Sequence, residues 1–311
     1  MRVYAWTALS GFHHEAVFYS GDADYLAGML PDIRGALGAG GRVLAAVADD
    51  KAELLRAALG GDAELVTFVD MAELGRNPAR IIPAWRDFLQ ERADGPTVGI
   101  GEPVWPGRTP AELVECRRHE SLLNLAFDGG AEWRLLCPYD ARALDPAVLA
   151  DARHNHPYVT ESGASRQSGE YVTTAAMLAW DGPLPAPAAE AAVLEFTPDH
   201  LHAIRDFISG RAAGVLPRGR ASDLVLAVNE LATNTIRHGG GRGLVRTWSD
   251  NGTLFVEVAD GGYIEDPLAG RERPPDLTDG GRGLWLVNHL CDLVQVRSSM
   301  AGSIVRLHMS V

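Results

Sequence analysis

Three polar residues recur at four-residue spacing toward the C-terminal end of this 311-residue chain: Glu230, Asn234 and His238. Residues four apart lie on one side of an α-helix, because each residue turns it by about 100°. The residues at the complementary helical positions are mostly apolar, and we expect them to face the core: Leu224, Ala227, Val228, Leu231 and Thr235. The spacing therefore predicts an amphipathic helix with a carboxylate, a carboxamide and an imidazole in one row.

Both ends of this helix have sequence signals. Ser222 is the predicted N-cap, since its hydroxyl can accept a hydrogen bond from a free amide of the first turn. Three glycines at 239–241 predict the other end, because glycine loses much conformational entropy in a helix. A β-hairpin should follow, with strands at 243–249 and 253–259 around Asn251-Gly252, a dipeptide typical of tight hairpin turns.

Two glycine-rich turns lie beyond these strands. Asp260 ends the second strand, and Gly261 and Gly262 allow a sharp turn after it. A carboxylate there can accept a hydrogen bond from the exocyclic amine of a purine, while the glycines leave room for the ring. The second turn, 280–284, precedes a helix predicted at 284–290, whose free amides and dipole favour an anion. The helix row and the turns together predict a pocket for a nucleotide and its metal ion.

In this order and spacing, residues 193–311 resemble the Bergerat (GHKL, histidine kinase-like ATPase) fold. This is a two-layer α+β ATP-binding fold shared by gyrase, large heat-shock chaperones, mismatch-repair ATPases and histidine kinases. The resemblance implies ATP or ADP with Mg²⁺ as cofactors. It implies a general base at Glu230 and a Mg²⁺ ligand at Asn234, both on the predicted helix.

The glycine-rich turns carry the rest of the resemblance. It implies that Asp260 and Gly262 hold the adenine and that Gly281 and Gly283 cradle the phosphates, with Leu284 beside them.

Several cations are alternatives for neutralising phosphate charge. Arg237, Arg282 and an arginine of the loop at 263–279 remain equally open. His238 either contacts a phosphate or caps the C-terminus of its helix.

Within that superfamily the closer likeness is to the anti-sigma factor serine/threonine kinases, whose helix reads Glu-x-x-x-Asn-x-x-x-His-Gly. Glu230, Asn234, His238 and Gly239 match this pattern. The resemblance implies a regulator that phosphorylates Ser or Thr of an antagonist protein, binds a sigma factor, or does both. Pairing into a homodimer is common in that family and stays open for this chain.

The chain departs from the family at Ile264, where a second glycine is common. A β-branched residue resists positive φ, so we expect the chain to leave the pocket on a different path. The loop at 263–279 that follows, the predicted lid, contains Pro267, Pro274 and Pro275 and several charges, which predicts irregular structure.

Two alternatives to a serine/threonine kinase remain. The first is a non-catalytic switch, in which nucleotide occupancy sets the lid and thereby the affinity for a partner. A histidine kinase is disfavoured, because His119-Glu120-Ser121 lacks the proline typical of a phosphoacceptor motif. An ATPase machine of the gyrase type is also disfavoured, since we expect no transducer domain after Val311.

Composition excludes several other classes. The net charge of −13 without a basic stripe argues against direct nucleic-acid binding. Three cysteines, Cys116, Cys137 and Cys291, are too few and too scattered to predict a disulfide framework or a zinc site. Residues 1–6 are too short an apolar start for a signal peptide, and no segment has the ~20 apolar residues of a membrane span. We therefore expect a cytoplasmic protein.

A Pro/Ala-rich linker is predicted at 181–192, and it separates residues 1–180 from residues 193–311. Residues 1–180 alternate between short apolar runs and helical stretches, which predicts a three-layer α/β domain. The expected strands are 42–48, 64–69, 97–100 and 132–137, and the expected helices are 24–37, 51–59, 78–92, 110–124 and 146–154.

This half resembles the MEDS domain, named for methanogens, methylotrophs and the DcmR regulator. The residues that carry the resemblance lie in these segments: 15–19, 38–44, 101–105, 120–124 and 136–140. It implies a RecA-like core, and no Gly-x-x-x-x-Gly-Lys-Ser/Thr is present, so we expect no working P-loop. The implied role is to sense a small molecule or to carry a partner surface.

Candidates for the sensory site follow the predicted strands, where open α/β sheets bind ligands. They are Glu102, Trp105, Cys137, Tyr139 and Asp140, with Glu102 first. The structural alternative, in which Trp105 and Cys137 are core and Asp140 caps the next helix, is preferred for the others. We expect surface or loop positions, and no metal cluster, for these five histidines: His13, His14, His119, His154 and His156.

Overall fold

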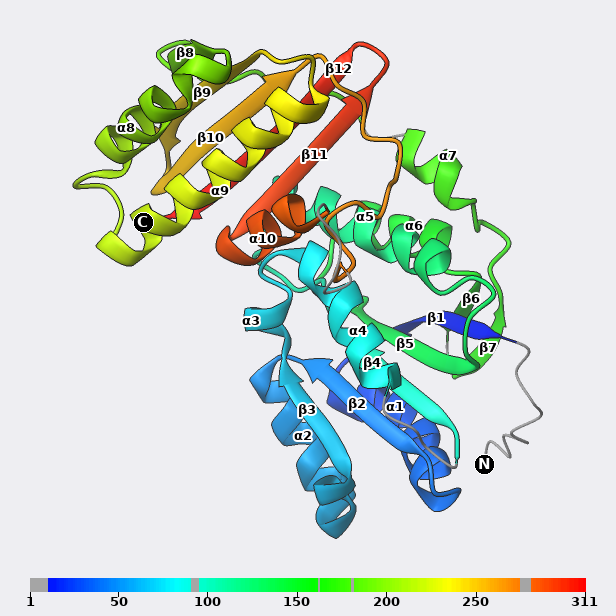
Figure 1. Cartoon of the computed structure of the whole chain (residues 1–311). Helices are drawn as coiled ribbons and strands as arrows, with labels where there is room; N and C mark the ends of the chain where they lie inside the picture. Colours follow the sequence, from blue (N-terminus) through cyan, green and yellow to red (C-terminus); the bar gives the residue numbers. More distant parts are fainter. Residues whose placement is uncertain (1–10, 91–94, 162, 180–181, 275–280) are drawn as a thin grey trace. The chain divides into compact units, whose positions relative to one another are not determined.

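The computed structural model describes residues 11–90, 95–161, 163–179, 182–274 and 281–311 (Figure 1). The chain divides into two compact units, Met1–Asp181 and Gly182–Val311, each with its own hydrophobic core. Residues 1–6, where we expect no signal peptide, lie outside the described ranges. Within those ranges, no helix is long and apolar enough to cross a lipid bilayer.

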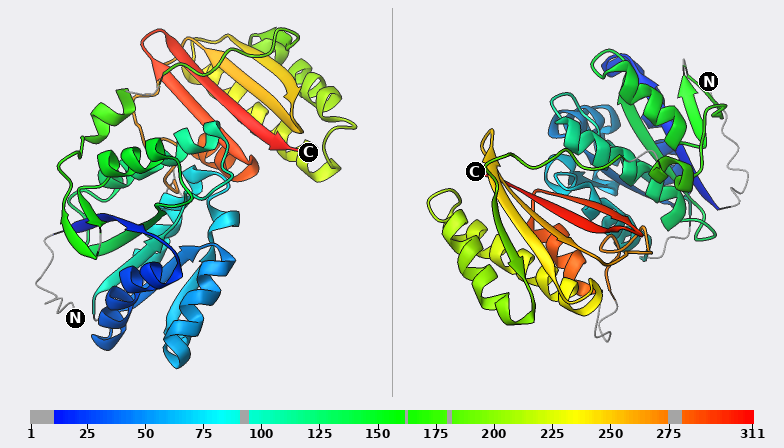
Figure 2. Two further views of the ribbon diagram at one scale, coloured as in Figure 1. Left: turned by 180° about the vertical axis from the view of Figure 1, so that it is seen from behind. Right: turned by 90° about the horizontal axis from the view of Figure 1, so that it is seen from above.

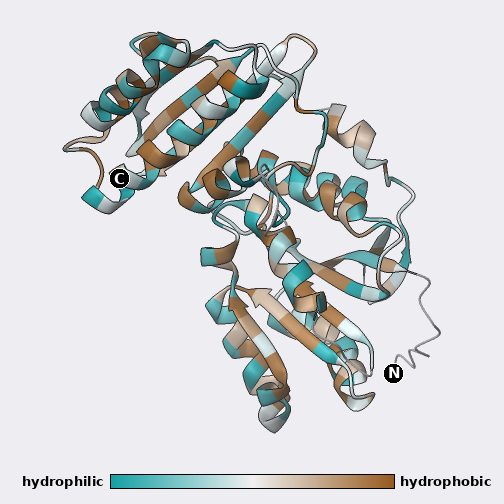
Figure 3. Cartoon of the chain, in the orientation of Figure 1, coloured by the Kyte–Doolittle hydropathy of each residue, from teal (hydrophilic) through white to brown (hydrophobic). Residues whose placement is uncertain are grey.

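Seven strands form the sheet of the first unit: β1 (Phe12–Tyr19), β2 (Arg42–Val47), β3 (Val66–Asp70), β4 (Thr97–Gly101), β5 (Trp133–Asp140), β6 (Tyr158–Glu161) and β7 (Ala164–Gln167). Their order is β3-β2-β4-β5-β1-β6-β7. All neighbours pair in parallel except β6 and β7, so the sheet is mixed. β2 and β4 are largely apolar along their length, as expected for strands covered on both faces (Figure 3).

Helices connect these strands and cover both faces of the sheet. The helices are α1 (Asp22–Gly38), α2 (Asp49–Leu59), α3 (Met71–Leu74), α4 (Ile81–Gln90), α5 (Pro110–Ala126), α6 (Pro146–Asn155) and α7 (Thr174–Ala179), with 3-10 turns at Gly60–Leu65 and Pro78–Arg80. Val98 and Ile100 of β4 share a core with α1 and α2. Gly99, between them, instead faces the Trp85 ring of α4, where a Cβ would lie 2.9 Å from the nearest ring carbon. Alternate residues of the strand therefore pack against helices on opposite faces of the sheet.

The sequence predicts most of these elements to within three residues, and it misses β1, β6, β7, α3 and α7. β1 is the most consequential omission, because it lies between β5 and β6. Its first half contains His13, His14 and Glu15, which suggest a polar interruption, yet all three are buried. The helix predicted at 78–92 begins as a 3-10 turn and becomes α4 at Ile81; residues 91 and 92 lie outside the described ranges.

The second unit is a five-stranded antiparallel sheet with helices on one face (Figures 1 and 2). The strands are β8 (Ala192–Phe196), β9 (Gly243–Asp250), β10 (Thr253–Asp260), β11 (Leu293–Ser299) and β12 (Gly302–Ser310), in the order β11-β12-β10-β9-β8. The helices are α8 (Leu201–Ala212), α9 (Arg218–His238) and α10 (Arg282–Leu290), after a 3-10 turn at Pro198–His200. This two-layer α+β arrangement is consistent with a GHKL-type ATPase domain.

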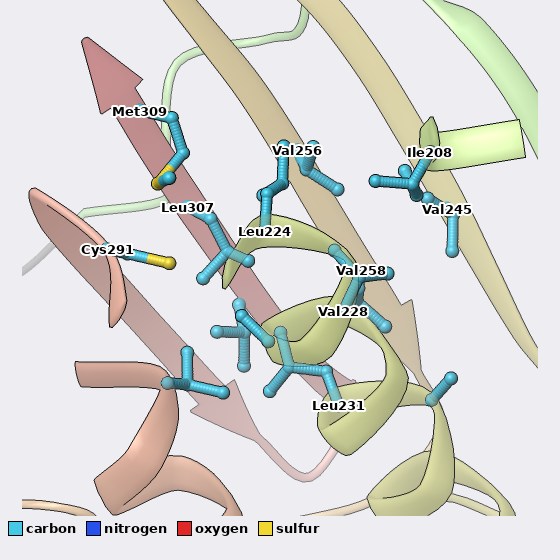
Figure 4. Packing of buried hydrophobic residues seen from close by; sticks show 14 of the residues in the cluster. Ile208, Leu224, Val228, Leu231, Val245, Val256, Val258, Cys291, Leu307 and Met309 are labelled. Atoms are coloured by element: carbon cyan, nitrogen blue, oxygen red, sulfur yellow. The ribbon is translucent and has the colours of Figure 1, made fainter. Parts of the chain in front are cut away.

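The predicted amphipathic helix is α9, and its core face is confirmed. The five residues expected there are all buried: Leu224, Ala227, Val228, Leu231 and Thr235. Figure 4 shows Leu224, Val228 and Leu231 of this face beside Val256 and Val258 of β10. Full burial of one such side chain contributes about 1.5–3 kcal/mol, so this face anchors the polar row on the opposite side of α9.

The predicted N-cap at Ser222 is wrong. α9 begins at Arg218 after Pro217, whose carbonyl accepts a hydrogen bond from Ala221 N at 2.9 Å. Ser222 lies inside the helix, and its hydroxyl donates to the Arg218 carbonyl at 3.1 Å. The helix ends at His238 with Gly239 as C-cap, as predicted.

The predicted hairpin is confirmed with one extra residue on each strand. β9 and β10 pair around Asn251 and Gly252, which have φ values of 45° and 74°. Positive φ at both positions is the geometry of a type I′ turn and explains the Asn-Gly dipeptide.

Residues 182–191 contain no helix or strand. Two of their carbonyls are bonded to the sheet: Gly182 O accepts from Arg297 Nε at 3.3 Å, and Pro185 O accepts from Arg306 Nη2 at 2.7 Å. This segment therefore lies along β11 and β12.

Candidate functional site

A cavity of about 470 Å³ opens in the second unit between α9, β10, β12, α10 and the loop after β10. Small-molecule sites in proteins usually have volumes of about 300–1,000 Å³. The predicted residues that line it are Asn234, His238, Asp260, Gly262, Gly281, Gly283 and Leu284. Ile264 also lines it, as do Thr235 and Ser303, which the sequence does not predict for the site.

The polar row of α9 meets the start of α10 at Gly283. A Cβ placed on Gly283 would lie 2.9 Å from Asn234 Nδ2 and 3.3 Å from Glu230 Oε2. Glu230 and Asn234 are both half-buried, and both side chains therefore reach the first turn of α10. Because glycine has no side chain, the backbone of α10 can approach these two polar groups closely.

Asp260 is held at the end of β10 by two hydrogen bonds. Thr235 Oγ1 donates to Asp260 Oδ2 at 2.6 Å, and Gly262 N donates to Asp260 Oδ1 at 2.8 Å. Each carboxylate oxygen has a further lone pair, so the half-exposed carboxylate can still accept from a ligand. A Cβ on Gly239 would lie 2.5 Å from Asp260 Cγ, so a glycine at the C-cap of α9 is needed for this approach.

Strand pairing adds two serines that the sequence analysis does not identify. Ser303 Oγ donates to the Gly262 carbonyl at 2.9 Å, and Ser298 Oγ accepts from Ile264 N at 2.8 Å. The two hydroxyls lie 2.7 Å apart. They come from β11 and β12, some 40 residues downstream, and no local sequence signal marks them.

The hydrogen bond from Ile264 N to Ser298 Oγ fixes the backbone where the chain leaves the cavity. Among the described non-glycine residues, only Asn251 has positive φ, so Ile264 is not strained where the family has a second glycine. From Tyr263 to Pro274 the chain forms only turns and bends, as predicted for the lid. Asn288 Nδ2 of α10 donates to the Gly270 carbonyl at 2.9 Å and ties this loop to the helix. The rest of the predicted lid, 275–279, lies outside the described ranges.

α10 begins two residues earlier than predicted, at Arg282. Its N-cap is Gly281, which has φ 82° and no side chain to satisfy the free amides of the first turn. Those amides and the helix dipole favour an anion at this end of the cavity. Gly281 and Arg282 are exposed, and Gly280 lies outside the described ranges.

His238 is exposed at the last position of α9, next to the cavity. Arg237 is exposed as well but does not line the cavity, whereas Arg273 of the lid does.

In the first unit, Glu102 is the sensory candidate with the most unusual environment. It is 6% exposed and accepts a hydrogen bond from Tyr19 Oη at 2.9 Å. Burial raises its pKa to about 7, although the Tyr19 bond and the Lys51 charge act in the opposite direction. Its second oxygen, Oε2, is buried and has no hydrogen-bond partner among the described atoms.

Of the other sensory candidates, Asp140 lies close enough to Glu102 for its charge to raise the pKa of that carboxyl, whereas Cys137 and Tyr139 face away from it. Cys137 and Tyr139 are buried. They are at odd positions of β5, and on the opposite side of this strand Leu136 packs with α1 and α2. Trp105 is half-buried, with the Arg108 guanidinium 3.6 Å from its ring centroid. The predicted cap at Asp140 is wrong: Asp140 accepts from Arg142 N in a turn, and Asp145 caps α6.

The expectation of surface histidines in the first unit is also wrong. Four of the five are buried: His13, His14, His119 and His156. Burial of His119 on α5 is incompatible with an exposed phosphoacceptor. His154, on α6, is half-buried. The missed strand β1 accounts for His13 and His14, because a strand between two neighbours turns one side chain to each covered face.

Family models match both units. Residues 13–157 match the methanogen/methylotroph, DcmR sensory domain (MEDS), and residues 194–309 match the histidine kinase-like ATPase domain. No curated protein matches the chain. A match to the ATPase family implies that the second unit binds nucleotide.

Two solved structures are similar to parts of the chain. The RsbU and RsbW domains of Rv1364c from Mycobacterium tuberculosis are 17% identical over 40% of this chain and 33% of that one, with a TM-score of 0.29. The Acinetobacter baumannii histidine kinase AdeS is 14% identical over 38% of this chain and 67% of that one, with a TM-score of 0.25. The match thus spans about a third of the length of the first of these structures.

The two family matches lie in different compact units. Their residue ranges do not overlap, and neither range includes the segment at 182–191 between them. The chain thus carries a MEDS domain toward its N-terminus and a histidine kinase-like ATPase domain toward its C-terminus.

Proposed function

We propose that this protein is a regulatory, ATP-binding kinase of the anti-sigma type, which phosphorylates Ser or Thr of an antagonist protein, binds a sigma factor, or does both. Residues 193–311 bind ATP and Mg²⁺, and residues 1–180 gate that activity as a sensory domain through the linker at 181–192. The observation that carries the proposal is that Asp260, Asn234 and Gly283 line one cavity, with Gly283 close to the Asn234 carboxamide.

The residues present fit a Mg²⁺-bound nucleotide. Asp260 is an acceptor for an adenine amine, and Asn234 offers a carboxamide oxygen, the kind of ligand that Mg²⁺ accepts. The start of α10, capped by Gly281, offers backbone amides to phosphate. The bound metal ion would offset negative charge on the transferred phosphoryl group.

The chain's own residues then have distinct roles. Asn234 would hold the metal ion beside the phosphates, and Asp260 with Gly262 fixes the base. Glu230, beside the first turn of α10, orients or deprotonates the attacking hydroxyl. His238 and Arg273 line the cavity and Arg282 is the first residue of α10, so these three groups are the candidates to neutralise phosphate charge.

A second candidate function is a nucleotide-dependent switch without phosphoryl transfer. The hydrogen bond between Asn288 of α10 and the Gly270 carbonyl favours this function. Through that bond, a shift of α10 caused by nucleotide at its start would also move the lid. In that case lid position sets the affinity for the partner.

Incubation with γ-labelled ATP and candidate antagonist proteins separates the two functions. The kinase predicts label on a partner Ser or Thr, whereas the switch predicts tight nucleotide binding without label. Glu230→Gln should retain ATP affinity and lose at least 100-fold in transfer rate, the usual size of a general-base contribution. The exposed Glu195, on β8, provides the matched control Glu195→Gln, which should transfer at the wild-type rate. Unchanged transfer by Glu230→Gln contradicts the assigned base.

The metal role of Asn234 needs its own measurement. Asn234→Ala should weaken ATP binding with Mg²⁺ present and have little effect with EDTA present, as measured by calorimetry. Asn229 is on the same helix but lines a different cavity, so Asn229→Ala is the control and should bind as wild type. Equal losses with and without Mg²⁺ would assign Asn234 to another role.

A further inference from the structure

Four buried side chains of the first unit converge on one point. His14 of β1, Glu120 of α5, Cys137 of β5 and His156, just after α6, each offer one ligand atom, and these atoms all lie within 4.8 Å of one another. Each of the four side chains is at most 1% exposed. None belongs to the candidate nucleotide site, which is in the second unit.

Four of the six distances between these ligand atoms match the edges of a tetrahedron around a metal ion, and the other two are at most 4.8 Å. Glu120 Oε2 lies 3.1 Å from His14 Nε2, 3.3 Å from His156 Nε2 and 3.6 Å from Cys137 Sγ, and Cys137 Sγ lies 3.4 Å from His14 Nε2. Zn–N and Zn–O bonds of about 2.0 Å and a Zn–S bond of about 2.3 Å give tetrahedral edges of roughly 3.3–3.6 Å. The four atoms are therefore spaced as four ligands of one ion.

Hydrogen bonds outside the cluster orient both imidazoles. His14 Nδ1 donates to Asn124 Oδ1 at 3.0 Å, and Asn124 is itself oriented, because its Nδ2 donates to the Asn155 carbonyl at 2.7 Å. His156 Nδ1 donates to the Ala152 carbonyl at 2.7 Å. In each neutral ring the proton is thus on Nδ1 and the lone pair of Nε2 points into the cluster. This outer arrangement is typical of metal-binding histidines.

Because these hydrogen bonds place the ring protons on Nδ1, no positive charge from the described residues lies at the centre of the cluster to balance the Glu120 carboxylate. Two Nε2 lone pairs face one carboxylate oxygen, and lone pairs repel unless a cation lies between them. Among the described residues, the ionic partners of Glu120 are these two histidines alone. Glu120 Oε1 and His156 Nε2 are buried and have no hydrogen-bond partner among the described atoms, and such atoms are costly in a protein interior.

We propose that His14, Glu120, Cys137 and His156 bind a Zn²⁺ ion in a closed tetrahedral site. Two nitrogens, one oxygen and one sulfur form a donor set that suits zinc. The Cys137 thiol loses its proton to solvent when the metal binds, so the net charge of the centre is neutral with ionised Glu120.

Such a site joins two central strands to the helical layer above them. β1 and β5 pair in parallel, Glu120 of α5 contacts a residue of each strand, and α6 ends just before His156. Because all four ligands are buried, the ion binds as the unit folds rather than through an open channel. The site therefore contributes to the stability of the MEDS domain.

The test uses the full chain purified from zinc-supplemented medium. We expect about one Zn²⁺ per chain by elemental analysis, as four protein ligands bind one structural zinc. The protein refolded with Co²⁺ should show intense visible d–d bands and a sulfur-to-cobalt charge-transfer band, the signature of a tetrahedral thiolate site. Cys137→Ala should lose the charge-transfer band and the stoichiometric metal. Cys116→Ala removes another buried thiol of α5 and should retain both.

Asn124→Ala provides a second variant that keeps all four ligands. It should weaken metal affinity about 10- to 100-fold, as loss of an outer hydrogen bond to a ligating histidine usually does. Wild-type protein with neither bound zinc nor a Co²⁺ spectrum would overturn the proposal and leave a protonated His–Glu network in its place. A Co²⁺ spectrum that persists in Cys137→Ala would overturn the assigned thiolate.

Discussion

At Gly283 the backbone of α10 passes so close to α9 that any side chain would displace Asn234. A Cβ there would lie 2.9 Å from Asn234 Nδ2 and 3.3 Å from Glu230 Oε2, and both are ends of flexible side chains. The fold can adapt to the extra methyl group, but the two polar groups cannot keep their positions. One glycine therefore holds the arrangement that both proposed roles need.

Gly283→Ala should lower the affinity for Mg²⁺-ATP by at least about tenfold, or roughly 1.4 kcal/mol, with little change in thermal stability. Calorimetry and a melting curve measure the two effects. Gly219 lies in α9, and a Cβ at this position would have no atom within 4 Å, so Gly219→Ala is the matched control and should bind ATP as wild type. Wild-type affinity in Gly283→Ala would show that Asn234 and Glu230 need not be placed as they are.

Glu102 predicts a pH dependence of stability. Its pKa in the folded state is raised from 4.5 to about 7 by burial. Between these values the folded protein holds a proton that the unfolded chain has lost, so stability falls as pH rises from about 4.5 to 7 and then levels off. The full loss is roughly 3 kcal/mol, at 1.36 kcal/mol per pKa unit.

Glu102→Gln should remove this dependence and make the first unit more stable than wild type at pH 8, but not at pH 4.5. Urea unfolding of both proteins at the two pH values measures the difference. Glu170 is exposed in the same unit, so Glu170→Gln is the control and should follow wild type. A Glu102→Gln advantage that is equal at both pH values would contradict a raised pKa.

At the scale of elements, the β9–β10 hairpin brings Asp260 to the cavity. The register pairs Asp260 with Gly243 of β9 and with Ser303 of β12. A slip by one residue would turn every side chain to the other face and remove Asp260 from the site. The turn that sets the register has positive φ at Asn251 and Gly252.

Gly252→Ala should destabilise the second unit by about 1 kcal/mol, because an L-residue at φ 74° is strained. Asparagine tolerates this region better, so Gly252→Asn should cost less. No atom lies within 4 Å of a Cβ at this position, so backbone strain is the only steric cause. Thermal unfolding of the two variants measures the order, and equal stability of Gly252→Ala and wild type would contradict it.

At the scale of the whole molecule, the two hydrophobic cores are separate, one in each unit. The segment at 182–191 belongs to the second unit, since its carbonyls at Gly182 and Pro185 accept from arginines of β11 and β12. Arg306, which donates to Pro185, also bonds the buried Glu257 of β10 at 2.6 Å. The segment thus supplies a carbonyl acceptor to the arginine of the buried Arg306–Glu257 ion pair.

Residues 182–311 alone should therefore fold and bind ATP with an affinity within about threefold of the full chain, a difference below 1 kcal/mol. Residues 191–311 lack the Pro185 carbonyl and should unfold at a lower temperature. Calorimetry and thermal unfolding of both fragments against the full chain measure these outcomes. A fragment 182–311 that does not bind ATP would mean that the nucleotide site depends on the first unit.

The sequence by itself determined the features that depend on local periodicity and turn chemistry. The buried face of α9, the Asn251-Gly252 hairpin and the irregular loop after Gly262 all follow from residues within about 20 positions of one another. The same local signals place Asp260 at a strand end, and the two family resemblances are confirmed by the family matches.

Only the tertiary structure decided what depends on distant partners. Strand pairing brings Ser303 to the nucleotide cavity and Ser298 to the backbone of Ile264, which lines that cavity. His14 lies 123 residues from Cys137 in the chain, and β1 becomes a central strand only because β5 and β6 pair with it on either side. A buried histidine and an exposed one have the same sequence signature, since burial is a property of what packs around a residue. For that reason the polar row of α9 could be predicted from the sequence, whereas the proposed metal-binding cluster of the MEDS domain could not.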